Sequence, residues 1–180
     1  RLAGLGIEGV EARTFHASAL RQLGTLWPRF TGRDLPEVLN TKAQILNPIA
    51  NGLPGAYPFL PRRELAGEIE WAKNRLGNPV GYQEAIEAAD RTPPLPADLM
   101  QRTFAAYERT KGERRMDFED MLLMLVNLLD DEPEAARLVH ERFHAFTVDE
   151  YQDVNPLQQA LLERWLDGRD ELCVVGDDYQ

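Results

Sequence analysis

Two short apolar runs near the end of the sequence constrain the fold more than any other feature. The first spans residues 146–148 and stops at Asp149-Glu150, and the second spans residues 172–175 and stops at Gly176-Asp177. A helical pattern joins them, so together they predict a β-α-β unit, whose strands are parallel. We therefore expect Asp149 and Asp177 to lie at the same end of one sheet.

The composition of these runs also predicts how deeply they lie. Strands of parallel sheets are covered on both faces and are apolar almost throughout, as these two are. On this basis Cys173 should be a packed core residue. Residues 7–15 fit the end of a third strand, near Arg13.

The sequence before these runs has mostly helical periodicity. Thr14 is a suitable N-cap for a helix that Pro28 should end, and Asp117 is a suitable N-cap for a segment so apolar that it should lie in a core. Residues 30–63 should be mostly irregular. Further helices are predicted over residues 35–47, 63–76, 82–90, 96–111, 118–129 and 133–143, and from Pro156 up to Gly168. Asn155 is a suitable N-cap for the last of these, and Pro133 is a suitable first residue for the helix over 133–143. Gly77 stands where a C′ glycine should end the helix over 63–76, whose apolar face includes Leu76. The predicted fold class is α/β and predominantly helical, with an all-helical block between two α/β parts.

Charge and composition exclude several classes of protein. The 20 Lys and Arg against 30 Asp and Glu give a net charge of −10 at pH 7, which argues against a protein that coats nucleic acid. The single cysteine excludes an internal disulfide and a multi-cysteine zinc site. No apolar run approaches the roughly 18 to 20 residues of a membrane span, and no signal peptide is evident, so we expect a cytoplasmic protein. Because the sequence begins with Arg1, we expect a piece of a longer protein.

Asp149-Glu150 is the strongest candidate for a chemical site. An acidic pair directly after an apolar strand has the form of a Walker B element, in which one carboxylate holds Mg²⁺ and the next can activate water. The dipeptide alone also fits a solvated turn, because acidic residues are common at strand ends and helix starts. Its flanking sequence decides between the two interpretations.

The flanking sequence matches a known family in four places. Residues 148–158 (VDEYQDVNPLQ) and 174–180 (VVGDDYQ) closely resemble motifs II and III of the UvrD/PcrA/Rep type of superfamily 1 DNA helicases. Residues 14–16 (TFH) and 116–122 (MDFEDML) resemble two further segments of that family, in the same order. The text around residues 68–73 is most similar to its actinobacterial branch.

The resemblance implies a division of the chain. Residues 1–26 and 116–180 would belong to the first motor domain, a RecA-like parallel sheet of the P-loop NTPase type, and residues 27–115 would form its inserted helical subdomain. The resemblance also implies ATP and Mg²⁺ as cofactors of the full-length enzyme. Its partners would be single-stranded DNA and junctions between single and double strands.

Roles at the nucleotide follow from the same resemblance. Asp149 would coordinate Mg²⁺, and Glu150 would be the catalytic base that accepts a proton from water. Gln180 would contact the γ-phosphate and couple the nucleotide state to DNA. Gln152 and Asp153 would brace the site.

The Thr-Phe-His segment would contact DNA. The resemblance places Thr14, Phe15 and His16 on the path of single-stranded DNA. The basic pairs at 62–63 and 114–115, together with Lys111, could touch DNA phosphates, although a solvated loop is the favoured interpretation.

The sequence also lacks a part that hydrolysis needs. No Gly-x-x-x-x-Gly-Lys-Ser/Thr phosphate loop occurs among the 180 residues. We therefore expect a fragment of an ATP-dependent DNA helicase that is inactive by itself, whereas the full-length protein would translocate on DNA and unwind it in repair or replication. The alternative is a non-catalytic DNA- or protein-interaction module with a degenerate motor.

Overall fold

The computed structural model describes residues 11–54, 57 and 61–177 of the chain. Its elements are, in order, α1 (Phe15–Thr31), β1 (Glu37–Val38), α2 (Ala43–Asn51), α3 (Arg62–Asn74), α4 (Tyr82–Ala88), α5 (Ala97–Lys111), β2 (Arg115–Met116), α6 (Phe118–Asp131), α7 (Pro133–Arg142), β3 (Phe146–Val148), the 3-10 turn η2 (Tyr151–Asp153), α8 (Pro156–Leu166) and β4 (Leu172–Val174). The chain is thus mostly helical, with short parallel strands. No helix in these described ranges is long and apolar enough to cross a bilayer.

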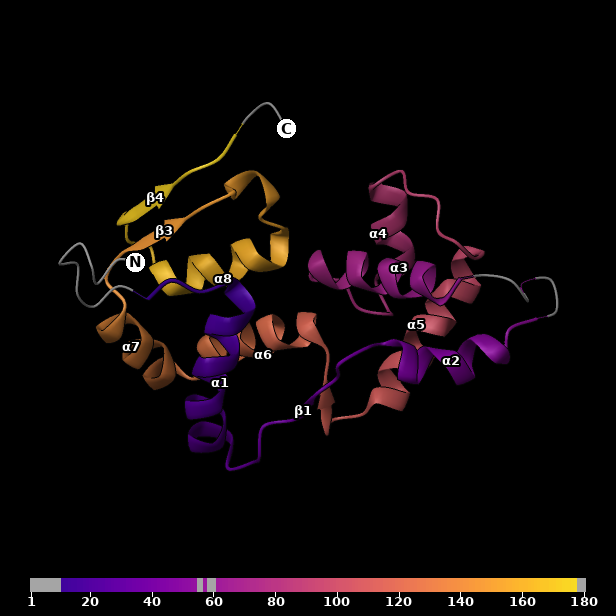
Figure 1. Cartoon of the computed structure of the whole chain (residues 1–180), viewed down its shortest axis with the longest axis horizontal. Coiled ribbons are helices and arrows are strands. Elements are labelled where there is room, and N and C mark those ends of the chain that lie inside the picture. The colour runs from indigo at the N-terminus through magenta and orange to yellow at the C-terminus, as the bar shows by residue number, and fades with distance from the viewer. Residues whose placement is uncertain (1–10, 55–56, 58–60, 178–180) are drawn as a thin grey trace.

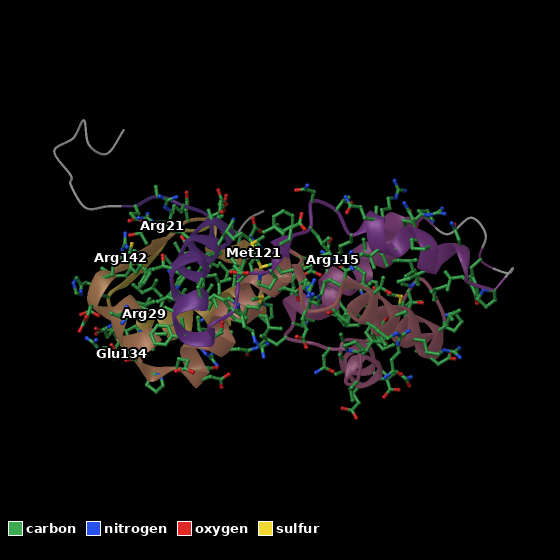
Figure 2. All side chains as sticks on the ribbon, turned by 90° about the horizontal axis from the view of Figure 1, so that it is seen from below. Arg21, Arg29, Arg115, Met121, Glu134 and Arg142 are labelled. Atoms are coloured by element: carbon green, nitrogen blue, oxygen red, sulfur yellow. The ribbon has the colours of Figure 1, made fainter. Side chains whose placement is uncertain are left out.

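The helices gather into two lobes, each with its own hydrophobic core (Figure 1). The first lobe consists of α1, α6, α7, α8 and the strands β3 and β4, and α6 lies at its centre against α1, α7 and α8. The second lobe consists of α2, α3, α4 and α5. Seen from below, Arg115 lies where the chain passes between the lobes (Figure 2).

A small parallel pair marks this passage. β1 leaves the first lobe and β2 returns to it, with Glu37 opposite Arg115 and Val38 opposite Met116. These strands were not predicted from the sequence, because two residues are too few to show an alternating pattern.

The prediction that Pro28 ends the first helix was wrong. α1 continues to Thr31 and ends at Gly32, which has φ +67° and donates its N–H to the carbonyl of Pro28. Pro28 removes one helical hydrogen bond. However, Leu26 lies in the core of the first lobe, and Trp27 and Phe30 pack against the same core on either side of the proline. Tertiary packing therefore outweighs the local cost.

The helix predicted over residues 35–47 is displaced. The structure has β1 at its start and α2 over Ala43–Asn51, with Pro48 inside the helix. Ile45 and Leu46 are fully or almost fully buried in the second lobe, so packing of this apolar face fixes where the helix lies.

The exit from α3 also differs in detail from the prediction. The left-handed residue is Leu76, with φ +61°, and the N–H of Gly77 reaches back 2.9 Å to the carbonyl of Ala72. A side-chain carbon at Gly77 would lie 2.7 Å from that oxygen. Glycine is therefore needed at 77 for close approach, in a Schellman-type ending, and Leu76 is exposed instead of packed.

The predicted β-α-β unit is confirmed. β3 and β4 are parallel, with Val148 opposite Val174, so Asp149 and Asp177 follow their strands at the same end. Residues 11–14 form no strand, and residues 7–10 of that prediction lie outside the described ranges. Cys173 is exposed, contrary to prediction, because β3 is the single hydrogen-bonded neighbour of β4 in the described structure.

The predicted caps of the later helices are confirmed. Asp117 and Asp120 form a reciprocal capping box at the start of α6, and Asn155 and Gln158 form another at the start of α8. Pro133 occupies the first turn of α7. α6 is buried along most of its length, as its composition predicted.

Candidate functional site

The candidate site is the acidic loop that follows β3. Asp149 and Glu150 are both exposed, and the Glu150 amide donates to Oδ1 of Asp149 at 3.0 Å. Glu150 has left-handed backbone angles of φ 51° and ψ 45°, which is uncommon for a residue with a side chain. Such outliers persist where their surroundings fix them, and they concentrate at functional sites.

Gln152 fixes one side of this loop. Its Nε2 donates to Glu150 Oε2 at 2.6 Å, and its Oε1 accepts from the Asp177 amide at 3.1 Å. The side chain therefore connects the ends of the two strands and holds the loop, whereas its role in a nucleotide site stays a prediction. Gly176 leaves room for it, because a side-chain carbon at 176 would lie 2.6 Å from Gln152 Oε1.

Backbone contacts hold the loop against β4. The Val175 amide donates to the Val148 carbonyl at 2.8 Å, and the Tyr151 amide donates to the Val175 carbonyl at 3.0 Å. The Tyr151 hydroxyl also donates to Gln159 on α8, at 2.8 Å. The acidic loop is thus tied to both its strand neighbour and the following helix.

These residues fit a hard divalent cation. Carboxylate oxygens are the ligands that Mg²⁺ prefers, and it retains several waters, so one or two exposed carboxylates at a strand end suffice when substrate phosphates complete the set. Asp149 and Glu150 supply such oxygens at the edge where parallel sheets bind ligands. Gln180, the expected γ-phosphate contact, lies outside the described residues.

The Thr-Phe-His residues lie apart from the acidic loop. Thr14 caps α1, where its hydroxyl accepts from the Ala17 amide at 3.2 Å. The Phe15 ring stacks on Trp165 with centroids 5.7 Å apart. Trp165 lies ten residues after Asn155, near the end of α8, whereas the acidic loop precedes the start of that helix. The Thr-Phe-His residues and the acidic loop therefore lie near opposite ends of a helix about 15 Å long.

His16 faces the start of α6. Its ring meets Phe118 edge-on, with centroids 5.8 Å apart. Burial and the nearby positive charge of Lys42 lower the pKa of His16 below its ordinary value. The imidazole is therefore neutral near pH 7 and can accept a hydrogen bond from a ligand.

Sequence reasoning missed a buried ionic network beside His16. The Nζ of Lys73 lies 2.8 and 2.7 Å from the two oxygens of Asp117 and 2.5 Å from Asp120. The Nζ of Lys111 lies 2.5 Å from both Glu108 and Asp120. The network joins α3 and α5 of the second lobe to the first turn of α6 in the first lobe.

Charges in the network stabilise one another. Burial alone would raise the pKa of Asp117, yet Lys73 and Lys111 hold that pKa well below its usual value. Burial likewise opposes the charge on Lys73, but the surrounding carboxylates raise its pKa. Tyr107 completes the cluster, since its buried hydroxyl donates to Asp117 Oδ2 at 2.9 Å.

A second lysine extends the contact between the lobes. The Nζ of Lys42, which precedes α2, lies 2.7 Å from Glu119 on α6 and 3.0 Å from Glu70 on α3. Burial raises the pKa of Glu119, and Lys42 opposes that shift. Three lysines from the second lobe or its margin thus contact the first turn of α6.

The structure corrects part of the prediction for the basic segment at residues 111–115, which runs from the end of α5 to the start of β2. Lys111 is buried in the ionic network, and the Arg115 guanidinium donates to the carbonyls of Thr110 and Lys111 at the end of α5. Neither residue belongs to a solvated loop. A signal existed, because Lys73 lies four positions after Ile69 on the apolar face of α3, where a lysine needs an acidic partner.

The geometry defines a class, and comparison with known proteins gives the family. A parallel strand pair with an acidic loop at its carboxyl end is typical of α/β proteins that bind ligands at that edge. The sequence profile of the UvrD/REP helicase N-terminal domain matches residues 1–180. The chain therefore belongs to the UvrD/REP helicase family.

Relatives agree with this assignment. The chain is 40% identical, over 98% of its length, to the ATP-dependent DNA helicase UvrD2 of Mycobacterium tuberculosis (strain ATCC 25618 / H37Rv). It is 28% identical, over its whole length, to the ATP-dependent DNA helicase PcrA of Staphylococcus aureus (strain NCTC 8325 / PS 47). The chain spans 26% and 24% of these two proteins.

Proposed function

We propose that the full-length protein is an ATP-dependent DNA helicase and that the acidic loop after β3 is part of its ATPase site. The observation that carries this proposal is the parallel register of β3 and β4, which sets Asp149-Glu150 and Gly176-Asp177 at one edge. Membership of the UvrD/REP family supports the same reaction.

The acidic loop would divide the chemistry between two carboxylates. Asp149 would hold Mg²⁺, which when bound neutralises charge on the phosphate oxygens. Glu150 would orient the attacking water and accept its proton. The left-handed backbone of Glu150 and the hydrogen bond from Gln152 would fix the direction of that carboxylate. Gln180 would contact the γ-phosphate.

DNA would be bound at a separate place, near the start of α1. Thr14 and His16 are candidates for contacts with the phosphates of single-stranded DNA, and Phe15 supports them by packing on Trp165. Junctions of single- and double-stranded DNA are the proposed substrate. Residues 27–115, which include the second lobe, would be a helical insertion in a RecA-like motor domain formed by residues 1–26 and 116–180. Without a phosphate loop, these 180 residues alone would not hydrolyse ATP.

The test is DNA-stimulated ATPase activity of the full-length protein with Glu150→Gln. This change keeps the size of the side chain but removes its ability to accept a proton. We expect turnover to fall at least about 10²- to 10⁴-fold while nucleotide binding is retained. Asp149→Asn should weaken nucleotide binding as well as turnover.

Glu171→Gln is the matched control. Glu171 is exposed and directly precedes β4, at the opposite end of the same strand pair. This variant should hydrolyse ATP at the wild-type rate. Near wild-type turnover by Glu150→Gln would place the catalytic base elsewhere and contradict the proposal, whereas a wild-type protein without ATPase activity would favour a non-catalytic module.

A further inference from the structure

The end of α3 contacts the first lobe at two separate points. Lys73 binds Asp117 and Asp120 at the start of α6, as described above. The next residue, Asn74, accepts a hydrogen bond at its Oδ1 from Nδ2 of Asn155, at 3.1 Å. The second contact joins α3 to the residue that begins α8.

Asn155 holds a fixed orientation because both ends of its amide are used. Its Oδ1 accepts from the Gln158 amide at 2.9 Å in the capping box, which leaves Nδ2 directed to Asn74. Asn74 and Asn155 are both partly buried, so this hydrogen bond is shielded from water on part of its surface. The contact is therefore specific to the two amides.

Asn155 is also connected closely to the acidic loop. Between it and Glu150 lies the turn η2, in which the Asp153 amide donates to the Glu150 carbonyl at 2.9 Å and the Val154 amide donates to the Tyr151 carbonyl at 3.1 Å. No long, irregular segment separates the two residues. A shift of Asn155 would therefore move the backbone of the acidic loop.

The anchor on the other side is rigid. Lys73 is buried and is held by three carboxylates, so the backbone at the end of α3 has little freedom to move relative to α6. Asn74 therefore offers Asn155 an acceptor oxygen at a fixed position, which holds the start of α8 in place.

We propose that Asn74 is a positioning residue that links the second lobe to the loop bearing Asp149 and Glu150. The inference rests on the proposed ATPase function and adds a contact through which the second lobe affects turnover. Asn74 itself touches no reacting atom.

The test compares three variants of the full-length protein. Asn74→Ala removes the acceptor, Asn74→Asp retains an acceptor oxygen, and Asn51→Ala removes a similar acceptor whose partner is Arg62, far from α8. Two measurements are made on each variant: DNA-stimulated ATPase kinetics, and hydrogen exchange of the amides of residues 149–158 without nucleotide or DNA.

Asn74→Ala should exchange faster over residues 149–158 and should lose about 2- to 12-fold in DNA-stimulated kcat, the range expected for one neutral hydrogen bond, while KM for ATP changes less. Asn74→Asp and Asn51→Ala should stay within about twofold of wild type.

Exchange in Asn74→Ala that matches Asn51→Ala would overturn the link. Faster exchange in Asn74→Ala with unchanged DNA-stimulated turnover would show that this link has no effect on the reaction. If the wild-type protein showed no ATPase activity, the proposed function would fail, and hydrogen exchange would still decide whether Asn74 positions the loop.

Discussion

Lys73 and Asp117, 44 positions apart in sequence, meet through both carboxylate oxygens at 2.8 and 2.7 Å. Asp117 is also the N-cap of α6, so one carboxylate both starts the central helix of the first lobe and receives a lysine from the second. The junction between the lobes is therefore ionic at its centre, although each lobe has its own apolar core.

Removing this lysine should destabilise the protein strongly. In Lys73→Met, the three carboxylates that Lys73 contacts, those of Asp117, Asp120 and Glu108, would keep Lys111 as their one lysine partner among the described ion pairs. Removing one partner of a buried ion pair costs about 3–5 kcal/mol, and we expect a loss of that size in the free energy of unfolding. Urea unfolding of the chain measures the change. Arg102→Met, which breaks an exposed i,i+4 pair with Asp98, should cost less than about 0.5 kcal/mol. Equal losses in the two variants would contradict the importance of the network.

The same network predicts a loss of stability in acid. The pKa of Asp117 is lower in the folded chain than its ordinary 3.8, so the folded state holds this proton less tightly than the unfolded state does. The stability that Asp117 contributes is therefore fully present above about pH 4 and is lost as the pH falls towards the folded-state pKa. Urea midpoints measured from pH 7 to pH 3 test this, and Asp117→Asn should be less stable at pH 7 and show a shallower decline.

His16 should add a separate step at higher pH. Its pKa in the folded chain is below 6.5, so the unfolded state binds the proton more readily, and stability falls as the pH drops below about 6.5. His16→Gln should flatten the pH dependence of the urea midpoint between pH 7.5 and 5. An unchanged slope in His16→Gln would show that another group titrates there.

Gly176→Ala should alter the site without unfolding it. The added methyl group would displace the Gln152 side chain, which is exposed and can turn away, so the loss of stability should be under about 1 kcal/mol. The connection from Glu150 to Asp177 would be broken. ATPase activity of the full-length protein should therefore fall as far as in Gln152→Ala. The double variant should be no worse than either single one, whereas additive losses would mean that Gly176 acts independently of Gln152.

The chain should bind single-stranded DNA weakly by itself. Its net charge is −10, and several arginines already have acidic partners: Arg21 and Arg142, which lie on the α1 and α7 side of the first lobe in Figure 2, both bind Glu11. We expect a Kd on the order of 10⁻⁴ to 10⁻⁶ M at physiological salt, as for non-specific contacts. Fluorescence anisotropy with a labelled oligonucleotide measures it, and nanomolar binding would reveal a strong DNA site within these residues.

Local signals predicted much of the fold, and tertiary packing accounts for most of the differences. Asp117 and Asn155 were predicted correctly because a cap is a short-range interaction between a side chain and the next turn. Pro28 was predicted wrongly because the packing of Trp27 and Phe30 is not visible in local sequence. The position of α2 differed for the same reason.

The candidate site was predictable in part. The acidic loop follows its strand directly, so the place of Asp149 and Glu150 at the strand end and the parallel direction of β3 and β4 could be predicted from the sequence. The contact between Lys73 and Asp117 could not, because nothing in either segment identifies its partner 44 residues away. The exposed position of Cys173 also depends on which strands lie beside β4, which is a property of the whole sheet.

The lysines at the junction have a consequence for modularity. Lys42, Lys73 and Lys111 neutralise the buried acidic residues at the start of α6, so a deletion that removed the second lobe would leave Asp117, Glu119 and Asp120 without these counter-ions. A shortened first lobe, or a chimera that carries a foreign insertion, would need neutral residues at those positions or lysines supplied by the new segment. The second lobe therefore cannot be replaced alone, because the lysines and the acidic residues at the start of α6 have to be exchanged together.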